Sequence, residues 1–147
     1  MRKEEAVQVF ELKEYQRRCL GELAVHFRRI IAFAGVTDKP EKAAFEEKAG
    51  RAPYQQVKEL PGLPYVCLRV PTGGGKTVMA SHAVGVACRE YLRAGRCLVF
   101  WLAPTTQIVS QTIKALQDKN HPYRRGLESS LQGSVRVIDG KTATSLD

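Results

Sequence analysis

Apolar residues in the first part of the chain recur every three or four positions, which is the repeat of an amphipathic helix. This stripe runs over residues 12–31, and most of the arginines in the same stretch fall outside it. A second, shorter helix is predicted over residues 37–50, with Pro40 in its first turn and Gly50 just past its end. Residues 1–64 are therefore predicted to form an N-terminal helical segment.

Three short apolar runs follow, and each has the length and composition of a buried β-strand. They cover residues 65–70, 96–103 and 134–139. Between the first two runs, residues 76–92 are apolar on nearly every side, which predicts a helix packed between a sheet and its neighbours.

A further helix is predicted to begin at Thr105 or Thr106, and a polar connection with room for a short helix follows it. The inward-facing residues of this helix are expected to be Val109, Ile113 and Leu116. The order strand, helix, strand, helix, strand predicts parallel βαβ units. The expected fold class is α/β, with an incomplete parallel sheet and flanking helices over residues 65–147, preceded by the helical segment.

The chain has 147 residues, enough for one hydrophobic core, and a formal net charge of +8. Most of the excess lies in residues 65–147, with 11 Lys and Arg against 5 Asp and Glu, whereas residues 1–64 have 12 against 10. A basic surface favours a phosphate backbone as partner, and it is equally compatible with a solvated face. The charge alone leaves both interpretations open.

The cysteines and histidines show no spacing typical of a metal site. The four cysteines lie in apolar stretches without a C-x-x-C pair and are predicted to be buried free thiols: Cys19, Cys67, Cys88 and Cys97. The first residues are charged and do not resemble a signal sequence, and no apolar run reaches the ~18 residues of a membrane helix. We therefore expect a cytoplasmic protein that does not associate with a membrane.

A glycine-rich loop lies between the first predicted strand and the helix that follows it, the context of a phosphate-binding loop. Consecutive glycines let backbone N–H groups turn toward phosphates, a lysine adds positive charge, and a threonine hydroxyl coordinates Mg²⁺. We expect a nucleoside triphosphate and Mg²⁺ as ligands, with Lys76 and Thr77 in catalytic roles and Thr77 on the metal. The nucleotide-binding residues of the loop are Thr72, Gly73, Gly74, Gly75, Lys76 and Thr77.

The loop departs from the strict motif at its first position, where Val70 replaces the usual glycine or alanine. The alternative interpretation is a glycine-rich turn with an incidental lysine. The agreement of predicted strand, glycines, lysine, threonine and apolar helix favours the phosphate loop.

Two flanking motifs narrow the choice among phosphate-loop proteins. Leu12-Lys13-Glu14-Tyr15-Gln16 is similar to the L-x-x-Y-Q motif of the superfamily 2 helicases, and the chain most closely resembles the ATPase subunit of type III restriction enzymes and related DEAD/DEAH-box proteins. The resemblance implies that Gln16 pairs with the adenine edge and that Tyr15 packs nearby. In the alternative, Tyr15 belongs to the apolar stripe and Gln16 is a surface residue.

The second motif is Leu102-Ala103-Pro104-Thr105-Thr106-Gln107-Ile108-Val109-Ser110-Gln111, which is similar to helicase motif Ia, A-P-T-x-x-L-x-x-Q, with Ile108 in place of the usual leucine. In that family the turn contacts the nucleic-acid backbone, so the resemblance implies nucleic-acid-binding roles for Pro104, Thr105 and Thr106. Hydroxyls and N–H groups at a helix N-terminus bind phosphate without reading sequence. Thr105 is also a candidate helix cap, and both roles are compatible.

The resemblance implies a P-loop, RecA-like first motor domain: the ATP-binding portion of an ATP-dependent DNA helicase or translocase. A modification subunit is a possible further partner if the protein belongs to a restriction system. The stretch between Gln16 and Lys76 is longer than in compact helicases, so residues 31–64 resemble an inserted helical element.

The acidic D-E-x-[HD] motif that such enzymes need for hydrolysis is absent, because the chain contains no Asp-Glu dipeptide. We therefore expect the chain by itself to bind ATP weakly and to hydrolyse it negligibly. Two other functions remain open: a different P-loop NTPase, such as a nucleotide or metabolite kinase, and a non-catalytic nucleotide-binding or DNA-binding module.

Overall fold

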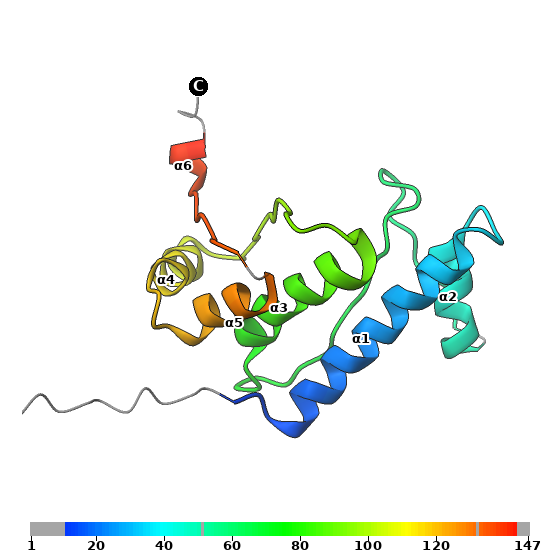
Figure 1. Ribbon diagram of the computed structural model, residues 1–147, viewed down its shortest axis with the longest axis horizontal. Coiled ribbons are helices and arrows are strands. Elements are labelled where there is room, and N and C mark those ends of the chain that lie inside the picture. The colour runs from blue at the N-terminus through cyan, green and yellow to red at the C-terminus, as the bar shows by residue number, and fades with distance from the viewer. Residues whose placement is uncertain (1–10, 51, 132, 144–147) are drawn as a thin grey trace, which may run out of the picture.

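The computed structural model describes residues 11–50, 52–131 and 133–143, and all structural statements below refer to them. Two helices form the N-terminal part, α1 (Glu14–Phe33) and α2 (Pro40–Ala49), and α2 packs against α1 (Figure 1). Both confirm the predicted helices. Pro40 is in the first turn of α2, and Gly50 follows its end with a φ of 63°.

The main hydrophobic core lies along the predicted apolar stripe of α1. Four α1 residues are buried together with Ala44 of α2 and Val86 of α3 (Lys76–Val86), and these are Leu23, Ala24, Phe27 and Ile30. Leu68, from the connection between α2 and α3, packs against the same cluster. The arginines of α1 lie outside the stripe, where Arg29 forms an ion pair with Glu47 of α2 at 3.2 Å.

The helix that follows the glycine loop has two parts. It begins as α3 (Lys76–Val86) and continues as a π-helix, η1 (Ala87–Leu92), so the prediction over residues 76–92 is confirmed. The helix ends before Gly95, because Arg93 adopts a left-handed conformation with a φ of 49°. Glu90 of η1 pairs with Arg28 of α1 at 3.1 Å, which attaches this end of the helix to α1.

In the described part of the chain, three more helices follow: α4 (Thr106–Gln117), α5 (Pro122–Leu131) and α6 (Gly140–Ala143). Helix α5 packs against α3 on one side and α4 on the other (Figure 1). The buried Arg124 of α5 donates to the carbonyl oxygen of Leu116 in α4 at 3.1 Å. Leu116 is buried as predicted, whereas Val109 is exposed and the inward position predicted for it is wrong.

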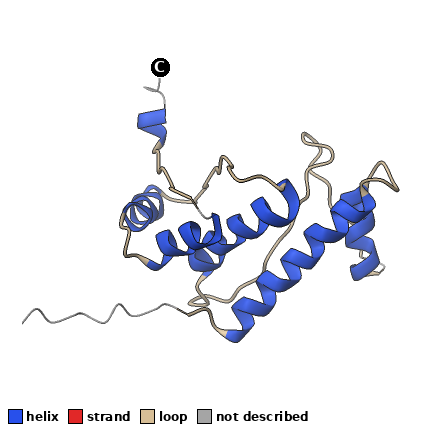
Figure 2. Ribbon diagram, in the orientation of Figure 1, coloured by secondary structure: helices blue, strands red, loops and turns tan. Residues whose placement is uncertain are grey.

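The parallel sheet expected from the three apolar runs is wrong. In the described part of the chain there is no β-strand, and the three runs are connections between helices (Figure 2). A strand exists only where its N–H and C=O groups pair with a neighbouring strand, and no such pairing joins these segments. The second run is openly exposed to solvent, with exposed fractions of 79% for Leu98, 82% for Phe100 and 91% for Leu102.

The prediction of four buried free thiols is also wrong. Cys88 of η1 and Cys97 form a disulfide with a Cα–Cα distance of 6.6 Å, which joins the end of the helix to the exposed apolar run. Cys19 and Cys67 are free, and the Cys67 thiol lies in an exposed residue. Within the described ranges, no helix is both long enough and apolar enough to cross a membrane.

Candidate nucleotide-binding site

The glycine loop between Pro71 and Lys76 is a tight turn that leads into α3. The N–H group of Gly74 donates to the carbonyl oxygen of Pro71 at 3.0 Å. Gly73 and Gly75 have φ values of 77° and 75°, a region that residues with a side chain rarely adopt. Gly75 is also the N-cap of α3, so the loop delivers the chain directly to the N-terminus of an 11-residue helix.

The two residues of the first flanking motif contact this loop through one backbone atom. The Tyr15 hydroxyl donates to the carbonyl oxygen of Gly74 at 2.6 Å, and Nε2 of Gln16 donates to the same oxygen at 2.9 Å. Nε2 also lies 3.4 Å from the Tyr15 hydroxyl oxygen. Residues almost sixty positions apart in the sequence therefore meet at Gly74.

The first turn of α1 fixes the side chain of Gln16. Gln16 is the third residue of the helix, and its Oε1 accepts a hydrogen bond from the backbone N–H of Lys13 at 2.8 Å. This is half of a capping box, in which a glutamine at this position satisfies a free N–H at the helix start. Only 3% of Gln16 is exposed, so the alternative of a surface glutamine is wrong.

The loop and α1 fit closely, because glycine leaves no spare room at two positions. A Cβ atom on Gly74 would lie 2.6 Å from Cγ1 of Val70, and one on Gly75 would lie 2.7 Å from Nε2 of Gln16. Val70, the departure from the strict motif, therefore packs directly on the loop. Glycine is required at both positions because neighbouring atoms leave no room for a side chain.

We expect Gly75→Ala to lower the free energy of unfolding by about 2 kcal/mol, from left-handed strain and displacement of the Gln16 amide. Urea unfolding followed by circular dichroism measures the loss. Gly73→Ala is the matched control, because Gly73 has nearly the same φ but no atom within 4 Å of its added Cβ. Equal losses in the two variants would show that Gln16 does not constrain the loop.

Lys76 and Thr77, the first two residues of α3, differ in exposure. The exposed Lys76 ammonium donates to the carbonyl oxygen of Pro71 at 3.2 Å, across the mouth of the loop. Thr77 is half-buried, and its carbonyl oxygen accepts from the Ser81 hydroxyl at 3.0 Å within α3. Thr72, at the tip of the loop, is exposed.

The donors for a metal ion are few. No group of three or more histidine, cysteine or acidic side chains that could hold a metal occurs in the described part of the chain. The Thr77 hydroxyl is an oxygen ligand of the kind Mg²⁺ accepts, but Mg²⁺ takes six oxygens. The residues present therefore fit Mg²⁺ only when nucleotide phosphates and water supply the other oxygens.

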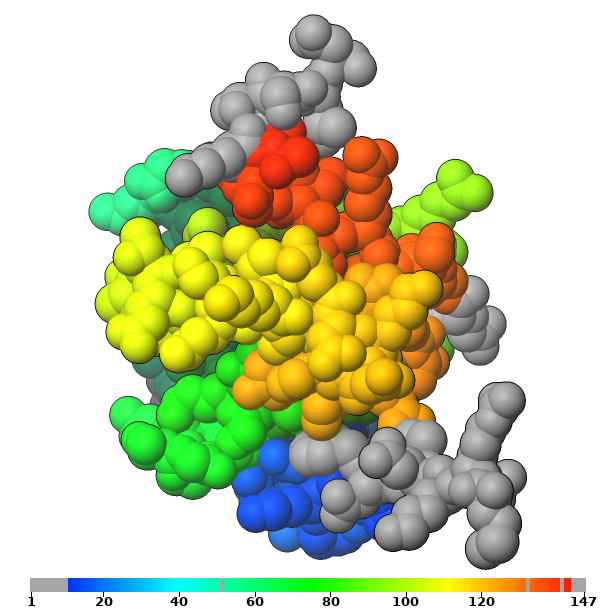
Figure 3. Space-filling view, turned by 90° about the vertical axis from the view of Figure 1, so that its left-hand side faces the viewer, coloured from blue at the N-terminus to red at the C-terminus, as the bar shows by residue number. Residues whose placement is uncertain are grey.

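The residues of the second flanking motif lie at the start of α4. Pro104, Thr105 and Thr106 are all exposed, and Thr105 caps the helix by accepting from the N–H of Ile108 at 3.3 Å. No hydrogen bond in the described structure joins them to the glycine loop. In the space-filling view, α4 (yellow) and the segment around the loop (green) are exposed on the same face of the molecule (Figure 3).

A comparison with known families decides which phosphate-loop proteins this chain is related to. The family described as type III restriction enzyme, res subunit, matches residues 9–145. The chain belongs to this family. The match confirms the resemblance drawn from the motifs, and it relates the chain to helicase-like, ATP-dependent enzymes. No curated protein and no solved structure matches the chain significantly.

The chain thus brings together one flanking motif and the glycine loop, and keeps the other motif at a separate helix start. Sequence reasoning did not find the shared acceptor, the carbonyl oxygen of Gly74. The available signal was the position of Gln16 three residues after Lys13, where a side chain turns back on its own helix. No comparable signal marked the Cys88–Cys97 disulfide.

Proposed function

We propose that this res-subunit chain is the ATP-binding portion of an ATP-dependent DNA helicase or translocase. The observation that carries the proposal is the pair of hydrogen bonds from Tyr15 and Gln16 to Gly74. These bonds put a planar amide and an aromatic ring next to a glycine loop at a helix N-terminus. A nucleotide has a base and phosphates that suit these two parts.

The phosphates would bind at the start of α3, where N–H groups and the positive end of the helix dipole attract anions. Lys76 donates to a neutral carbonyl group, and exchange of that partner for a phosphate gives a stronger, charge-assisted hydrogen bond. Thr77 would place its hydroxyl on a Mg²⁺ ion shared with the phosphates. Mg²⁺ would neutralise charge that develops on those oxygens.

The adenine would pair with the lone pair of Gln16 Oε1 that makes no hydrogen bond within the described structure. Its Nε2 is engaged with Gly74, and Oε1 accepts one hydrogen bond from Lys13 and keeps a second lone pair. That lone pair can accept from an amino group such as the one on adenine. Tyr15 is partly exposed beside it and offers an aromatic surface.

DNA would contact the start of α4. The Thr105 oxygen accepts a hydrogen bond from Ile108, so its own hydrogen remains available to donate to a phosphate oxygen. The first turn of α4 contains no acidic residue that would repel a phosphate. Binding through such groups is independent of base sequence. A modification subunit as partner stays a prediction.

Lys76→Ala tests the phosphate site. We expect the variant to bind ATP about 10- to 100-fold more weakly, because a charge-assisted hydrogen bond contributes about 1.5–3 kcal/mol. Isothermal titration of the purified chain measures the affinity. Lys119→Ala is the matched control, because Lys119 is an exposed lysine outside the loop. Unchanged affinity in the Lys76 variant would contradict the proposal.

Two further readouts separate the helicase proposal from its alternatives. Repetition of the titration with GTP in place of ATP, for wild type and Gln16→Ala, tests base recognition. Loss of the preference for ATP supports a helicase-type adenine site, and an unchanged ratio favours another kind of P-loop NTPase. Phosphate release should be negligible with or without DNA, and sustained DNA-stimulated release that Lys76→Ala abolishes would contradict that expectation.

A further inference from the structure

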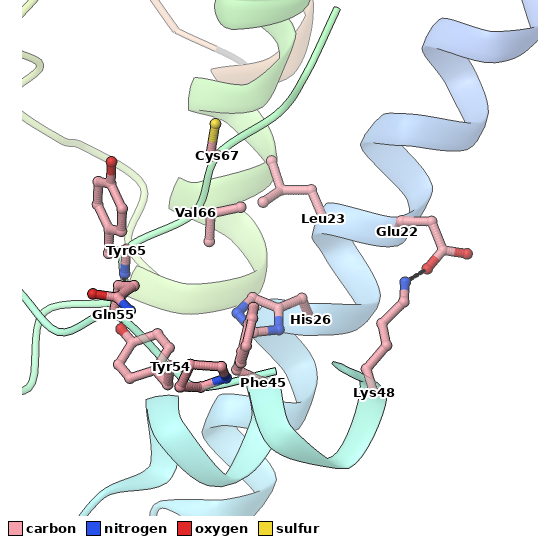
Figure 4. Close-up of a pocket in the computed structure, with 11 residues that line it drawn as sticks. Glu22, Leu23, His26, Phe45, Lys48, Tyr54, Gln55, Tyr65, Val66 and Cys67 are labelled. Atoms are coloured by element: carbon pink, nitrogen blue, oxygen red, sulfur yellow. Dashed lines mark hydrogen bonds and ion pairs between the residues drawn. The ribbon is translucent and has the colours of Figure 1, made fainter. Parts of the chain in front are cut away.

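A pocket of about 350 Å³ lies between α1, α2 and the connection that leads to the glycine loop (Figure 4). Residues 53–55 and 65–67 of that connection form two of its walls. None of the candidate nucleotide-binding residues lines it, so it is separate from the site described above. Its volume is within the range of small-molecule sites.

Three aromatic side chains line the pocket, Phe45, Tyr54 and Tyr65. The Tyr54 hydroxyl also forms hydrogen bonds with the backbone of the connection. The ring centroids of Phe45 and Tyr54 are 5.5 Å apart, with an angle of 51° between the rings. The Tyr54 hydroxyl accepts from the backbone N–H of Tyr65 at 3.0 Å and donates to the carbonyl oxygen of Leu63 at 3.3 Å. These contacts fix the rings of Phe45 and Tyr54 in the pocket.

Two polar side chains in the pocket have unused hydrogen-bonding capacity. Neither the His26 imidazole nor the Gln55 amide makes a hydrogen bond within the described part of the chain, although both line the pocket. Burial, and after it the charges of Lys48 and Arg29, lower the pKa of His26, so its imidazole is neutral at pH 7. A neutral imidazole and an amide each offer a donor and an acceptor.

The charged residues at the rim are already paired with each other. Glu22 of α1 and Lys48 of α2 form an ion pair, drawn as a dashed line in Figure 4. The hydrogen bond and the charge of Lys48 hold the pKa of Glu22 below its usual value, so the carboxylate stays ionised. The lining thus contains no unpaired charge that would select a charged ligand.

We propose that this pocket binds an uncharged heteroaromatic ring of nucleobase size, stacked on the aromatic walls with its polar edge toward His26 and Gln55. A purely hydrocarbon ring would bury these two polar groups without partners, which is costly. A ring with donors and acceptors on its edge satisfies them and keeps the stacking contact. The site would take a base from a free nucleoside or from a single strand.

The Cys67 thiol provides a direct readout, because this exposed cysteine lines the pocket. We expect millimolar thymidine or cytidine to slow alkylation of Cys67 by iodoacetamide about fivefold to tenfold, in line with base stacking on an aromatic ring. Peptide mass spectrometry measures the rate, and Cys19, outside the pocket, is the internal reference. These nucleosides lack phosphate, so Lys76→Ala should leave the protection unchanged, which separates this site from the proposed ATP site.

Two variants and one competing probe complete the test. Tyr65→Ala and Gln55→Ala should each raise the nucleoside concentration needed for half of the protection about tenfold. Tyr65 donates to Tyr54 through its backbone N–H, so neither change removes a described hydrogen bond. Gln56→Ala is the matched control, because Gln56 does not line the pocket. Protection by an oligothymidine at lower concentration would assign the base to a strand. No protection by nucleosides, unchanged protection in both variants, or protection by indole alone would overturn the proposal.

Discussion

Gly85→Ala should lower the free energy of unfolding by about 2–4 kcal/mol, although alanine is the better helix former. A Cβ atom on Gly85 of α3 would lie 2.0 Å from Cβ of Ser130 and 3.0 Å from its Cα. The second of these atoms is backbone, so a change of rotamer in α5 cannot relieve the clash. The two helices must move apart along the surface where they pack. Urea unfolding followed by circular dichroism measures the loss.

Gly21→Ala in α1 is the matched control, because this helical glycine has no atom within 4 Å of its added Cβ. We expect that variant to be more stable than wild type by about 0.5–1 kcal/mol, from helix propensity alone. Changes of the same sign in the two variants would contradict the close approach of α3 and α5. Partial recovery in the double variant Gly85→Ala, Ser130→Gly would locate the clash at this pair.

The triple variant Leu98→Ser, Phe100→Ser, Leu102→Ser should reduce self-association at least tenfold. The three side chains occupy every second position of a segment without secondary structure and are largely exposed, which predicts an aggregation site. Burial of one such side chain contributes about 1.5–3 kcal/mol, so tenfold is a lower bound. Sedimentation velocity over a range of protein concentrations measures the association. The variant should unfold at the same urea concentration as wild type, because it loses little buried surface.

Val36→Ser, Leu60→Ser is the control for general surface hydrophobicity. Both residues are exposed, with fractions of 78% and 54%, and both lie outside the apolar run. This double variant should associate like wild type. A reduction equal to that of the triple variant would show that total exposed apolar area, and not the segment around Phe100, drives the association.

The helices could be predicted from the sequence because each depends mainly on residues three or four positions apart. The apolar stripe of α1, Pro40 at the start of α2 and Thr105 at the start of α4 are local signals, and the structure confirms them. The range of the helix that ends in η1 was also predicted, but the geometry of its last turns was not. Its last residues form wider π-type turns and stop at Arg93, a residue without the backbone freedom of glycine.

The strands could not be predicted in the same way, because pairing between strands depends on segments that are distant in the sequence. The run from Arg96 to Ala103 has strand-like composition, yet composition does not supply a partner. Only Leu68 of the first run reaches the main core. Apolar composition therefore predicted burial correctly where a helix was present to cover the segment, and wrongly where none was.

The candidate site was predictable in its residues but not in its contacts. The motifs identified Gln16 and the glycines, and the structure places Gln16 on the carbonyl oxygen of Gly74. That contact depends on how α1 lies across the loop, which no spacing in the sequence specifies. The pocket beside His26 has the same origin, because it exists only where α1, α2 and two parts of the connection between α2 and α3 meet.

The Gln16 amide couples the proposed base site to the shape of the loop, because Oε1 is the proposed acceptor for the base and Nε2 donates to Gly74. The amide has two hydrogens, and these face the Gly74 carbonyl oxygen at 2.9 Å and the Tyr15 hydroxyl oxygen at 3.4 Å. A ligand that takes the Nε2 hydrogen away from the Gly74 carbonyl oxygen removes one of the two bonds that hold the loop to α1. By thermodynamic reciprocity, any change that loosens the loop must then alter the affinity for that ligand by the same free energy.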